Sequence, residues 1–253
     1  MSDARNPSRL MVSATHKSSG KTTIAVGLVH ALRERGLAVQ TFKKGPDYID
    51  PMWLTAASGR RCRNLDPYLS DAAEYRGAFR RHAAGADVSV VEGNKGLYDG
   101  LDLDGSNSNA ALAKALALPV VLVIDARGMT RGIAPLILGY QAFDRDVRIA
   151  GVILNNLGGS RHEAKLRMVI EHYTDVRVLG SVQCDPRLVI AERHLGLTPS
   201  NEADGVTQRI AAIGNLVGAQ VDVDAVLRIA AGVPPLAAPG DAIADPFPPA
   251  AEP

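Results

Sequence analysis

The chain has 253 residues, 46% of them hydrophobic and 22% charged, which is enough to bury a full core and excludes wholesale disorder. Its 28 lysines and arginines nearly balance 27 aspartates and glutamates, so the net charge is +1. The chain therefore lacks the overall positive charge that is typical of proteins that bind nucleic acid or an anionic membrane. The two cysteines, Cys62 and Cys184, are too few and too far apart for a disulfide scaffold or a zinc site. Without a bilayer-spanning apolar run or an apolar signal segment, we expect a cytoplasmic protein.

Short β-branched runs alternate with longer amphipathic stretches along most of the chain. The runs predict strands at residues 10–15, 38–42, 87–92, 119–125, 147–155 and 175–179. The amphipathic stretches predict helices at residues 21–35, 110–118, 132–143 and 161–172, the first ending at Gly36. Nearly continuous apolar strands such as 119–125 are typical of a parallel sheet covered on both faces. The pattern therefore predicts an α/β fold with a doubly wound, mostly parallel sheet.

The last 21 residues, 233–253, hold seven of the chain's fifteen prolines. Proline lacks the backbone donor that a helix interior or a central strand requires, so this segment is expected to be an extended linker or a disordered tail. We therefore expect one globular domain over residues 1–232 and a tail over 233–253. A linker usually joins two parts, and a following domain or partner is the alternative to a plain tail.

The strongest motif, SATHKSSGKTT at residues 13–23, lies between the first predicted strand and the first predicted helix. In a P-loop, backbone N–H groups at a helix start bind phosphate oxygens, a lysine adds positive charge and the next hydroxyl holds Mg²⁺. Thr15 stands where the pattern GxxxxGKS/T has its first glycine, but the strand–loop–helix context is correct. The motif predicts a nucleotide-phosphate site formed by Ser18, Ser19, Gly20, Lys21, Thr22 and Thr23.

Acidic residues follow three of the predicted strands at their carboxyl ends. Asp47 and Asp50 follow the second strand, Glu92 closes the third and precedes a glycine-rich loop with Asp99, and Asp125 closes the fourth. Carboxyl ends of parallel strands meet at one edge of a sheet, where ligands bind. We therefore favour metal or substrate contacts for these acids over the alternative of solvated loop residues.

Together these segments resemble the cobyrinic acid a,c-diamide synthase family over about residues 10–202. The motifs that carry the resemblance are SSGKTT (18–23), FKKGPDYIDP (42–51), NLD (64–66), EGNKGLYDG (92–100), PVVLVIDARGMTRG (119–132), AFDRDVRIAGVILN (142–155) and ERHLGL (192–197). The resemblance implies a dethiobiotin-synthetase-like P-loop fold that uses ATP and Mg²⁺ to amidate carboxylates of a tetrapyrrole-derived macrocycle. The segments HKSSGKTT and EGNKGLYDGLDLDGSNSN are most similar to those of a family branch linked to sulfur metabolism. Sirohaem or a related precursor is therefore an alternative substrate.

The chain departs from the family pattern in three respects, one of which is Lys17, where many members carry a small residue. The usual loop reads EGVMGLFDG, and here Asn94 and Lys95 replace its apolar pair, which makes the expected substrate wall more polar. The family also continues into a glutamine amidotransferase domain, which would begin where the proline-rich segment stands. Neither cysteine matches its nucleophile, so we expect free ammonia, or a glutaminase domain or partner, as the nitrogen source. A homodimer is a further possibility.

Amide synthesis requires an activated carboxylate, and transfer of the γ-phosphoryl group of ATP to the carboxylate produces an acyl phosphate that ammonia attacks. This step needs positioning and charge neutralisation, which we assign to Lys21 and Lys43. Thr22, Asp47 and Glu92 are expected to arrange Mg²⁺.

The resemblance supplies further roles. By family match, Tyr48, Ile49 and Asp99 line the substrate site, and Asp99 is also a candidate proton acceptor. The expected catalytic residues are therefore Lys21, Lys43, Asp47 and Asp99. Asn155 matches the final residue of GVILN and is expected at the adenine, with a turn-forming role as the alternative.

Several alternatives remain open. Arg60, Arg61 and Arg63 form a basic cluster that would suit a carboxylate-rich ligand or be a solvated charge run. Cys62 lies among these arginines, which would lower the pKa of its thiol. Other function classes are a P-loop switch or partitioning ATPase, whose KGGxGKS/T pattern has a lysine where His16 stands, and a tetrapyrrole chaperone without ATP turnover.

Overall fold

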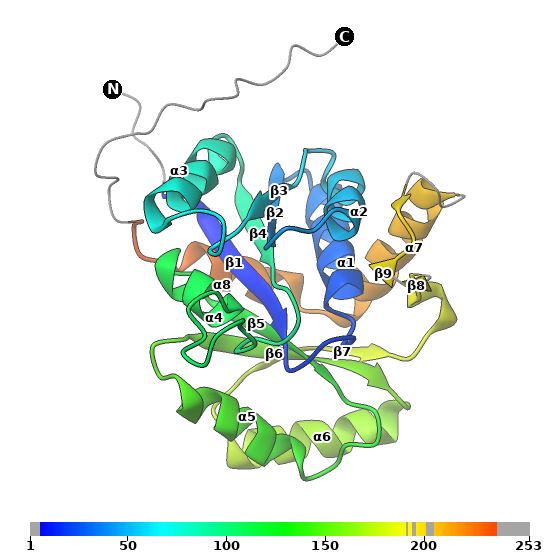
Figure 1. Ribbon diagram of the computed structural model, residues 1–253. Helices are drawn as coiled ribbons and strands as arrows, with labels where there is room; N and C mark the ends of the chain where they lie inside the picture. Colours follow the sequence, from blue (N-terminus) through cyan, green and yellow to red (C-terminus); the bar gives the residue numbers. More distant parts are fainter. Residues whose placement is uncertain (1–5, 191, 194–195, 201–204, 237–253) are drawn as a thin grey trace.

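A seven-stranded sheet forms the centre of the computed structural model, which describes residues 6–190, 192–193, 196–200 and 205–236 (Figure 1). The strand order is β3-β2-β4-β1-β5-β6-β7, and every neighbouring pair is parallel. The strands are β1 (Ser8–Ala14), β2 (Val39–Lys44), β3 (Arg63–Leu65), β4 (Val88–Glu92), β5 (Val120–Asp125), β6 (Ile149–Leu157) and β7 (Val178–Gln183). The predicted doubly wound α/β fold is confirmed.

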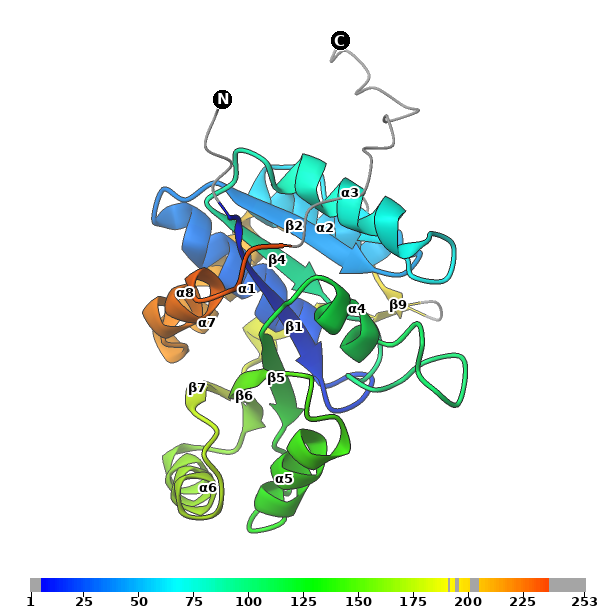
Figure 2. The same cartoon turned by 90° about the vertical axis from the view of Figure 1, so that its left-hand side faces the viewer.

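Helices cover both faces of the sheet (Figures 1 and 2). One hydrophobic core lies beneath α1 (Lys21–Glu34), α2 (Ile49–Ser58), α7 (Val206–Gln220) and α8 (Val223–Ala231). The other lies beneath α3 (Ala72–Ala83), α4 (Asn109–Ala115), α5 (Ile133–Phe143) and α6 (Ser160–Tyr173). Alternation along β1 explains the two cores, because Leu10 and Val12 enter the first while Met11 enters the second. Within the described ranges, none of these helices combines the length and apolar character that crossing a membrane requires.

Two predicted elements differ from the structure by three residues or more. The strand expected at 175–179 is β7 (Val178–Gln183), which continues through Gly180, a residue packed so closely on Val221 that a Cβ would lie 2.6 Å from its side chain. The helix expected at 110–118 ends at Ala115, because Ala117 adopts a left-handed backbone with φ of 47°.

The sequence analysis did not predict α2, β3, α3, α7 or α8, nor the short antiparallel strands β8 (Glu192–Arg193) and β9 (Gly196–Leu197). A signal for α3 was present, since Asp71 and Glu74 form a capping box at its start. The polar composition of α3 hid its helical pattern, because among the residues of this helix only Phe79 and Ala83 are buried.

The segment after α8 packs against the amino-terminal edge of the sheet. The fully buried Arg9 donates hydrogen bonds to the carbonyl oxygens of Leu116 at 2.7 Å and Pro234 at 2.6 Å. Arg80 donates to the carbonyl oxygen of Leu236 at 3.0 Å. Residues 233–236 of the predicted tail are therefore attached to the domain, and residues 237–253 lie outside the described part of the chain.

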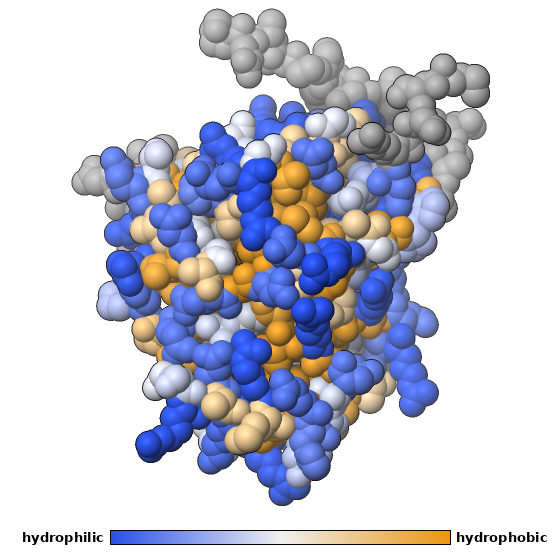
Figure 3. All heavy atoms as spheres, turned by 180° about the vertical axis from the view of Figure 1, so that it is seen from behind, coloured by the Kyte–Doolittle hydropathy of each residue, from blue (hydrophilic) through white to orange (hydrophobic). Residues whose placement is uncertain are grey.

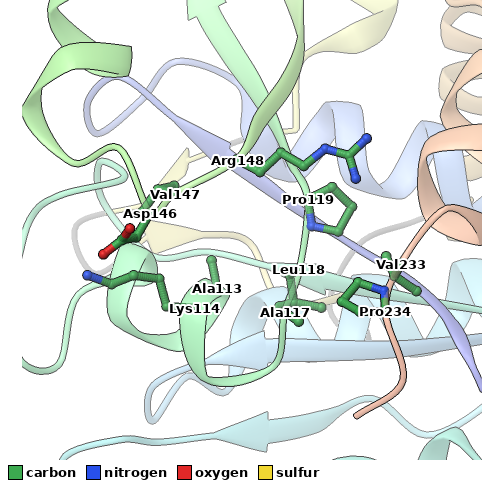
Figure 4. A pocket seen from close by; sticks show the side chains of 10 residues that line it. All are labelled: Ala113, Lys114, Ala117, Leu118, Pro119, Asp146, Val147, Arg148, Val233 and Pro234. Carbon is green, nitrogen blue, oxygen red and sulfur yellow. The ribbon is translucent and has the colours of Figure 1, made fainter.

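A hollow of about 370 Å³ lies beside this attached segment, between the start of β5 and the residues before β6 (Figure 4). Leu118, Pro119 and Val233 contribute apolar walls, and Lys114 and Asp146 carry charges at its border. From behind, apolar side chains reach the surface in the middle of the face, surrounded by hydrophilic ones (Figure 3). The hollow belongs to the amino-terminal edge, whereas the P-loop motif lies at the carboxyl edge.

Candidate functional site

The P-loop connects the end of β1 to the start of α1. Ser18 and Gly20 adopt left-handed backbones with φ of 62° and 86°, and the hydroxyl of the buried Ser19 donates to the carbonyl oxygen of His16 at 2.8 Å. Helix α1 begins at Lys21 with no side-chain cap and no acidic residue in its first turn. The first N–H groups of a helix have no intrahelical partner and carry partial positive charge. This helix start is therefore suited to bind an anion such as phosphate.

Asn155 holds the P-loop from the carboxyl-terminal part of β6. Its side-chain nitrogen Nδ2 donates to the carbonyl oxygen of Ser19 at 2.9 Å, and the residue is buried. A Cβ at Gly20 would lie 2.1 Å from this nitrogen, so Gly20 is required by space as well as by its positive φ. The predicted contact of Asn155 with adenine remains a prediction.

Buried charges gather beside the P-loop, at the ends of β2 and β4. The parallel register places Lys43 opposite Glu92, and both side chains are at most 1% exposed. Lys43 Nζ lies 3.1 Å from Glu92 Oε1 and 2.7 Å from Asp50 Oδ2, and it also donates to the carbonyl oxygen of Gly93 at 2.9 Å. The Lys43 ammonium is thus enclosed by two carboxylates and one carbonyl.

The burial of this cluster changes its acid–base properties. Burial lowers the pKa of Lys43, but Glu92 and Asp50 raise it by more, so that it lies above its ordinary value. Complete burial raises the pKa of Glu92, and the positive charge of Lys43 lowers it by less, so the pKa lies above its ordinary value. Burial also lowers the pKa of Lys21, with the charge of Glu92 acting in the opposite direction. Lys43 therefore stays protonated at neutral pH.

Thr22 joins this cluster to the P-loop helix. Its hydroxyl lies 2.6 Å from Glu92 Oε1, to which it donates, and 3.4 Å from Asp50 Oδ2. The other oxygen of Glu92, Oε2, is buried without a hydrogen-bond partner among the described residues. A buried carboxylate oxygen without a partner, beside a hydroxyl and a second carboxylate, fits a hard divalent cation such as Mg²⁺.

The protein supplies few ligands for such a cation. Among the described residues, no group of three or more histidine, cysteine or acidic side chains is arranged to hold a metal. Mg²⁺ commonly takes one or two carboxylates and completes its coordination with water and substrate phosphates. The arrangement of Thr22 and Glu92 beside a phosphate-binding loop is consistent with that pattern.

The two acids that follow β2 have different positions. Asp47 Oδ1 accepts hydrogen bonds from the backbone N–H groups of Ile49 at 3.0 Å and Asp50 at 3.1 Å, so Asp47 fixes the start of α2. Its charge is still close enough to raise the pKa of Lys43. The contacts with Lys43 and Thr22 belong to Asp50, which the sequence analysis counted among the acids at this edge but did not include in the expected Mg²⁺ set. Tyr48 is 83% exposed, and Ile49 is half-buried.

The glycine-rich loop after β4 lies beside the P-loop. Leu97 donates its backbone N–H to the carbonyl oxygen of Ala14 at 2.8 Å, and the exposed Asp99 accepts the N–H of Gly96 through Oδ2 at 2.8 Å. The fully buried Asn109 at the start of α4 accepts from Asn94 N–H at 2.9 Å and donates to Gly96 O at 2.7 Å. Sequence reasoning missed Asn109, although its place in SNSN before an apolar stretch could have marked it as a helix-start residue.

Two other predictions and one residue of a matching motif require comment. Asp125 pairs with the neighbouring Arg127, with 2.5 Å between Oδ2 and Nη2, and Thr23 donates its hydroxyl to the carbonyl oxygen of Leu188 at 3.3 Å. Neither side chain has a contact with the Lys43 cluster among the bonds of the described residues. His194, in the matching ERHLGL stretch, lies outside those residues.

Two of the three arginines of the basic cluster lie away from the candidate site. Arg60 donates to Gln40 Oε1 at 3.1 Å and to Gly85 O at 3.4 Å, so it lies at the amino-terminal edge of the sheet, before β3 and β4 begin. Arg61 also precedes β3, since its carbonyl oxygen accepts a hydrogen bond from Gln40 Nε2 at 3.0 Å, whereas Arg63 lies in β3 opposite Phe42. The structure therefore argues against a role for Arg60 and Arg61 at this site, and a ligand contact of Arg63 remains a prediction. The expectation of a lowered thiol pKa is also wrong, since burial raises the pKa of Cys62 to about 12.

Comparison with known proteins places the site in context. The family model CbiA, described as the CobQ/CobB/MinD/ParA nucleotide binding domain, matches residues 10–195. The chain is 49% identical over 231 residues to the cobyrinate a,c-diamide synthase of Magnetococcus marinus, and 46% over 249 residues to that of Methanosarcina acetivorans. These alignments cover 91% and 94% of this chain but 50% of each relative. The chain therefore spans about half the length of the curated relatives it matches.

A third relative and one solved structure extend the comparison. The cobyrinate a,c-diamide synthase of Listeria monocytogenes is 40% identical over 223 residues, covering 87% of this chain and 49% of the relative. The signal recognition particle receptor FtsY of Elizabethkingia anophelis superposes with a TM-score of 0.52 at 18% identity, covering 83% of this chain and 66% of that one. At this identity the likeness concerns the fold alone.

Proposed function

We propose, on the premise that this chain belongs to the CbiA family of nucleotide-binding domains, that it uses ATP and Mg²⁺ to amidate carboxylates of a tetrapyrrole-derived macrocycle. The observation that carries the proposal is the buried cluster of Lys43, Asp50 and Glu92, joined through Thr22 to the P-loop helix. The name of the relatives, cobyrinate a,c-diamide synthase, supports cobyrinate as the substrate class.

In the first step of the proposed reaction, a carboxylate oxygen of the macrocycle attacks the γ-phosphorus of ATP. The bond from phosphorus to the bridging oxygen breaks, and ADP leaves with the electron pair, so that an acyl phosphate forms. Lys21 and the N–H groups at the start of α1 hold and neutralise the phosphates. Because the Lys43 ammonium already contacts two carboxylates, we assign it the task of keeping Glu92 and Asp50 in position.

Bound Mg²⁺ would neutralise charge on the phosphate oxygens. Thr22 and Glu92 are the ligands that the geometry supports best, because Glu92 Oε2 has no hydrogen-bond partner among the described residues. Asp50 lies beside them, and Asp47 contributes its charge from the start of α2. The positive charge of Lys43 faces Glu92 and Asp50 and opposes the effect of burial on the pKa of Glu92.

In the second step, ammonia attacks the acyl carbon, inorganic phosphate leaves and the nitrogen loses a proton. Asp99 is the proposed acceptor, since it is exposed at this edge while Gly96 N–H fixes one of its oxygens. The raised thiol pKa of Cys62 argues against glutamine hydrolysis at that residue. Free ammonia, or a glutaminase domain or partner, is therefore the proposed nitrogen source.

Exposed apolar side chains at the same edge suit a large macrocycle. Tyr48 follows β2 and is 83% exposed, while Leu101 and Leu103 follow β4 and are 71% and 102% exposed. The loop that carries the leucines is ordered by its own hydrogen bonds, including Leu101 N–H to Asn107 Oδ1 at 2.9 Å. Such a surface provides apolar contact for a ring system whose carboxylates reach the polar cluster.

The test is incubation of the chain with ATP, Mg²⁺ and ammonium salt together with cobyrinate or sirohaem. We expect amide products by mass spectrometry and ADP formation that requires both macrocycle and ammonia. Lys21→Ala should reduce turnover by about a hundredfold or more, as loss of a charge-stabilising contact does, with Lys165→Ala on the exposed surface of α6 as the unaffected control. ATP hydrolysis independent of the macrocycle would instead identify a switch ATPase, and macrocycle binding without ATP turnover a chaperone.

A further inference from the structure

Lys95 has an unusual backbone for a side chain of its size. Its φ is 47°, in the left-handed region, and the side chain is exposed at the carboxyl edge of the sheet. A non-glycine residue pays conformational energy there and persists in such a geometry only where its surroundings hold it. The turn is held from two sides, because Asn94 Oδ1 accepts the N–H of Lys95 at 2.9 Å and Asn109 Nδ2 donates to the carbonyl oxygen of Asn94 at 2.6 Å.

The residues on either side of Lys95 are anchored to two different parts of the candidate site. Before it, Gly93 O accepts a hydrogen bond from the buried ammonium of Lys43 at 2.9 Å. After it, Leu97 N–H donates to Ala14 O at 2.8 Å, at the start of the P-loop. Lys95 therefore stands at the tip of a turn that bridges the end of β2 and the phosphate loop.

A second lysine lies behind this turn. Lys44 is the last residue of β2 and half-buried, and the next residue, Gly45, faces Asn94, whose Nδ2 would be 3.7 Å from a Cβ there. Burial lowers the pKa of Lys44, Asp66 opposes this shift, and the nearby charge of Lys95 adds to it. The charge of Lys43 is compensated by Glu92 and Asp50, whereas Lys95 brings an exposed positive charge to the same edge, and the half-buried Lys44, near Asp66, lies behind it.

We propose that Lys95, with Lys44 behind it, binds a second, non-reacting carboxylate of the substrate and so selects macrocycles that carry several carboxylates. The inference rests on the proposed function. A substrate with many similar carboxylates needs a second point of attachment to present one of them to the γ-phosphoryl group. A cation on a rigid turn between the phosphate loop and the Lys43 cluster provides that attachment.

The experiment measures equilibrium binding of cobyrinate by its visible absorbance, without ammonia, to the wild type, Lys95→Gly, Lys95→Arg and Lys165→Ala. Glycine adopts the positive φ without strain and removes the lysine side chain with its charge, whereas arginine keeps a long side chain and the charge. We expect Lys95→Gly to weaken binding about three- to fivefold, the effect of losing one exposed ion pair, and high salt to reduce the difference. Lys95→Arg and Lys165→Ala should bind as the wild type does, and a fully esterified cobyrinate should show no dependence on Lys95.

Unchanged cobyrinate binding by Lys95→Gly, an equal loss in Lys165→Ala, or absence of binding by the wild type would overturn the inference. A loss of ATP affinity in Lys95→Gly with unchanged macrocycle binding would also overturn it, since Lys95 would then serve the nucleotide. Amide formation with Lys95-independent binding removes this inference and leaves the proposed function standing. Lys95-dependent binding without amide formation supports the carboxylate contact of Lys95 and contradicts the proposed amidation.

Discussion

The side chain of Asn155 is bonded to the carbonyl oxygen of Ser19, 136 positions earlier in the sequence, at 2.9 Å. The residue that follows Ser19, Gly20, lies so close to the same amide that any side chain would collide with it. The shape of the phosphate loop is thus set from β6, a strand that does not adjoin β1 in the sheet.

Replacement of Asn155 separates two roles for this residue. If the amide acts by holding the loop, Asn155→Ala should weaken ATP and GTP binding by a similar factor and reduce stability by about 1 kcal/mol, the net worth of one hydrogen bond. Calorimetric titration with both nucleotides and urea unfolding measure these effects. A loss restricted to ATP would show instead that Asn155 recognises adenine.

The Lys43–Glu92 pair lends itself to a double-mutant cycle. Lys43→Met leaves Glu92 as a completely buried carboxylate and should cost about 3 kcal/mol of unfolding free energy. Adding Glu92→Gln removes that buried charge, so the double variant should be more stable than the sum of the single effects predicts by about 1 kcal/mol or more. Additive losses in urea unfolding would mean that the two side chains do not interact energetically.

The two cysteines should differ sharply in reactivity. Cys62 is buried and its thiol pKa is raised to about 12, whereas Cys184 is exposed. We expect iodoacetamide at pH 8 to label Cys184 alone in the native protein and both residues in denaturant, as read by intact mass. Cys184→Ser serves as the control and should remain unlabelled until it unfolds.

The raised pKa of Cys62 also has a consequence for stability. Its folded value of about 12 exceeds the ordinary value of 9.0, so the native state retains a proton that the unfolded state loses. This thiol therefore favours unfolding as the pH rises above 9.0, and Cys62→Ala should reduce the loss of stability between pH 9 and pH 10. An identical pH dependence in the variant would contradict this assignment.

Arg9 should be important for stability although it lies far from the phosphate loop. It is fully buried and donates to the carbonyl oxygens of Leu116, Pro234 and Pro7. Arg9→Met should cost about 2–4 kcal/mol, because buried carbonyl groups lose their donor. Arg148→Ala is the matched control, since this exposed arginine makes one long bond of 3.3 Å to Gly232 O and its loss should change stability little. Equal effects in urea unfolding would contradict the role given to Arg9.

Sequence pattern by itself determined the layered parallel sheet and the position of the phosphate loop. The apolar strand at 120–125 and the GKT step at Gly20–Thr22 are local signals, because continuous apolar runs and a strand–loop–helix context do not depend on distant residues. The expectation that Lys43 and Glu92 lie at one edge also followed from local pattern, since Lys43 directly follows the predicted strand at 38–42 and Glu92 ends the one at 87–92.

Only the tertiary structure decided which side chains at that edge meet. Asp47 and Asp50 are equivalent in sequence, but the start of α2 turns Asp47 toward backbone N–H groups and leaves Asp50 to pair with Lys43. Arg60 follows the same motif and yet lies at the opposite edge, because a helix carries the chain back before β3 begins. These outcomes depend on strand register and on hydrogen bonds between distant residues, whose partners local spacing does not specify.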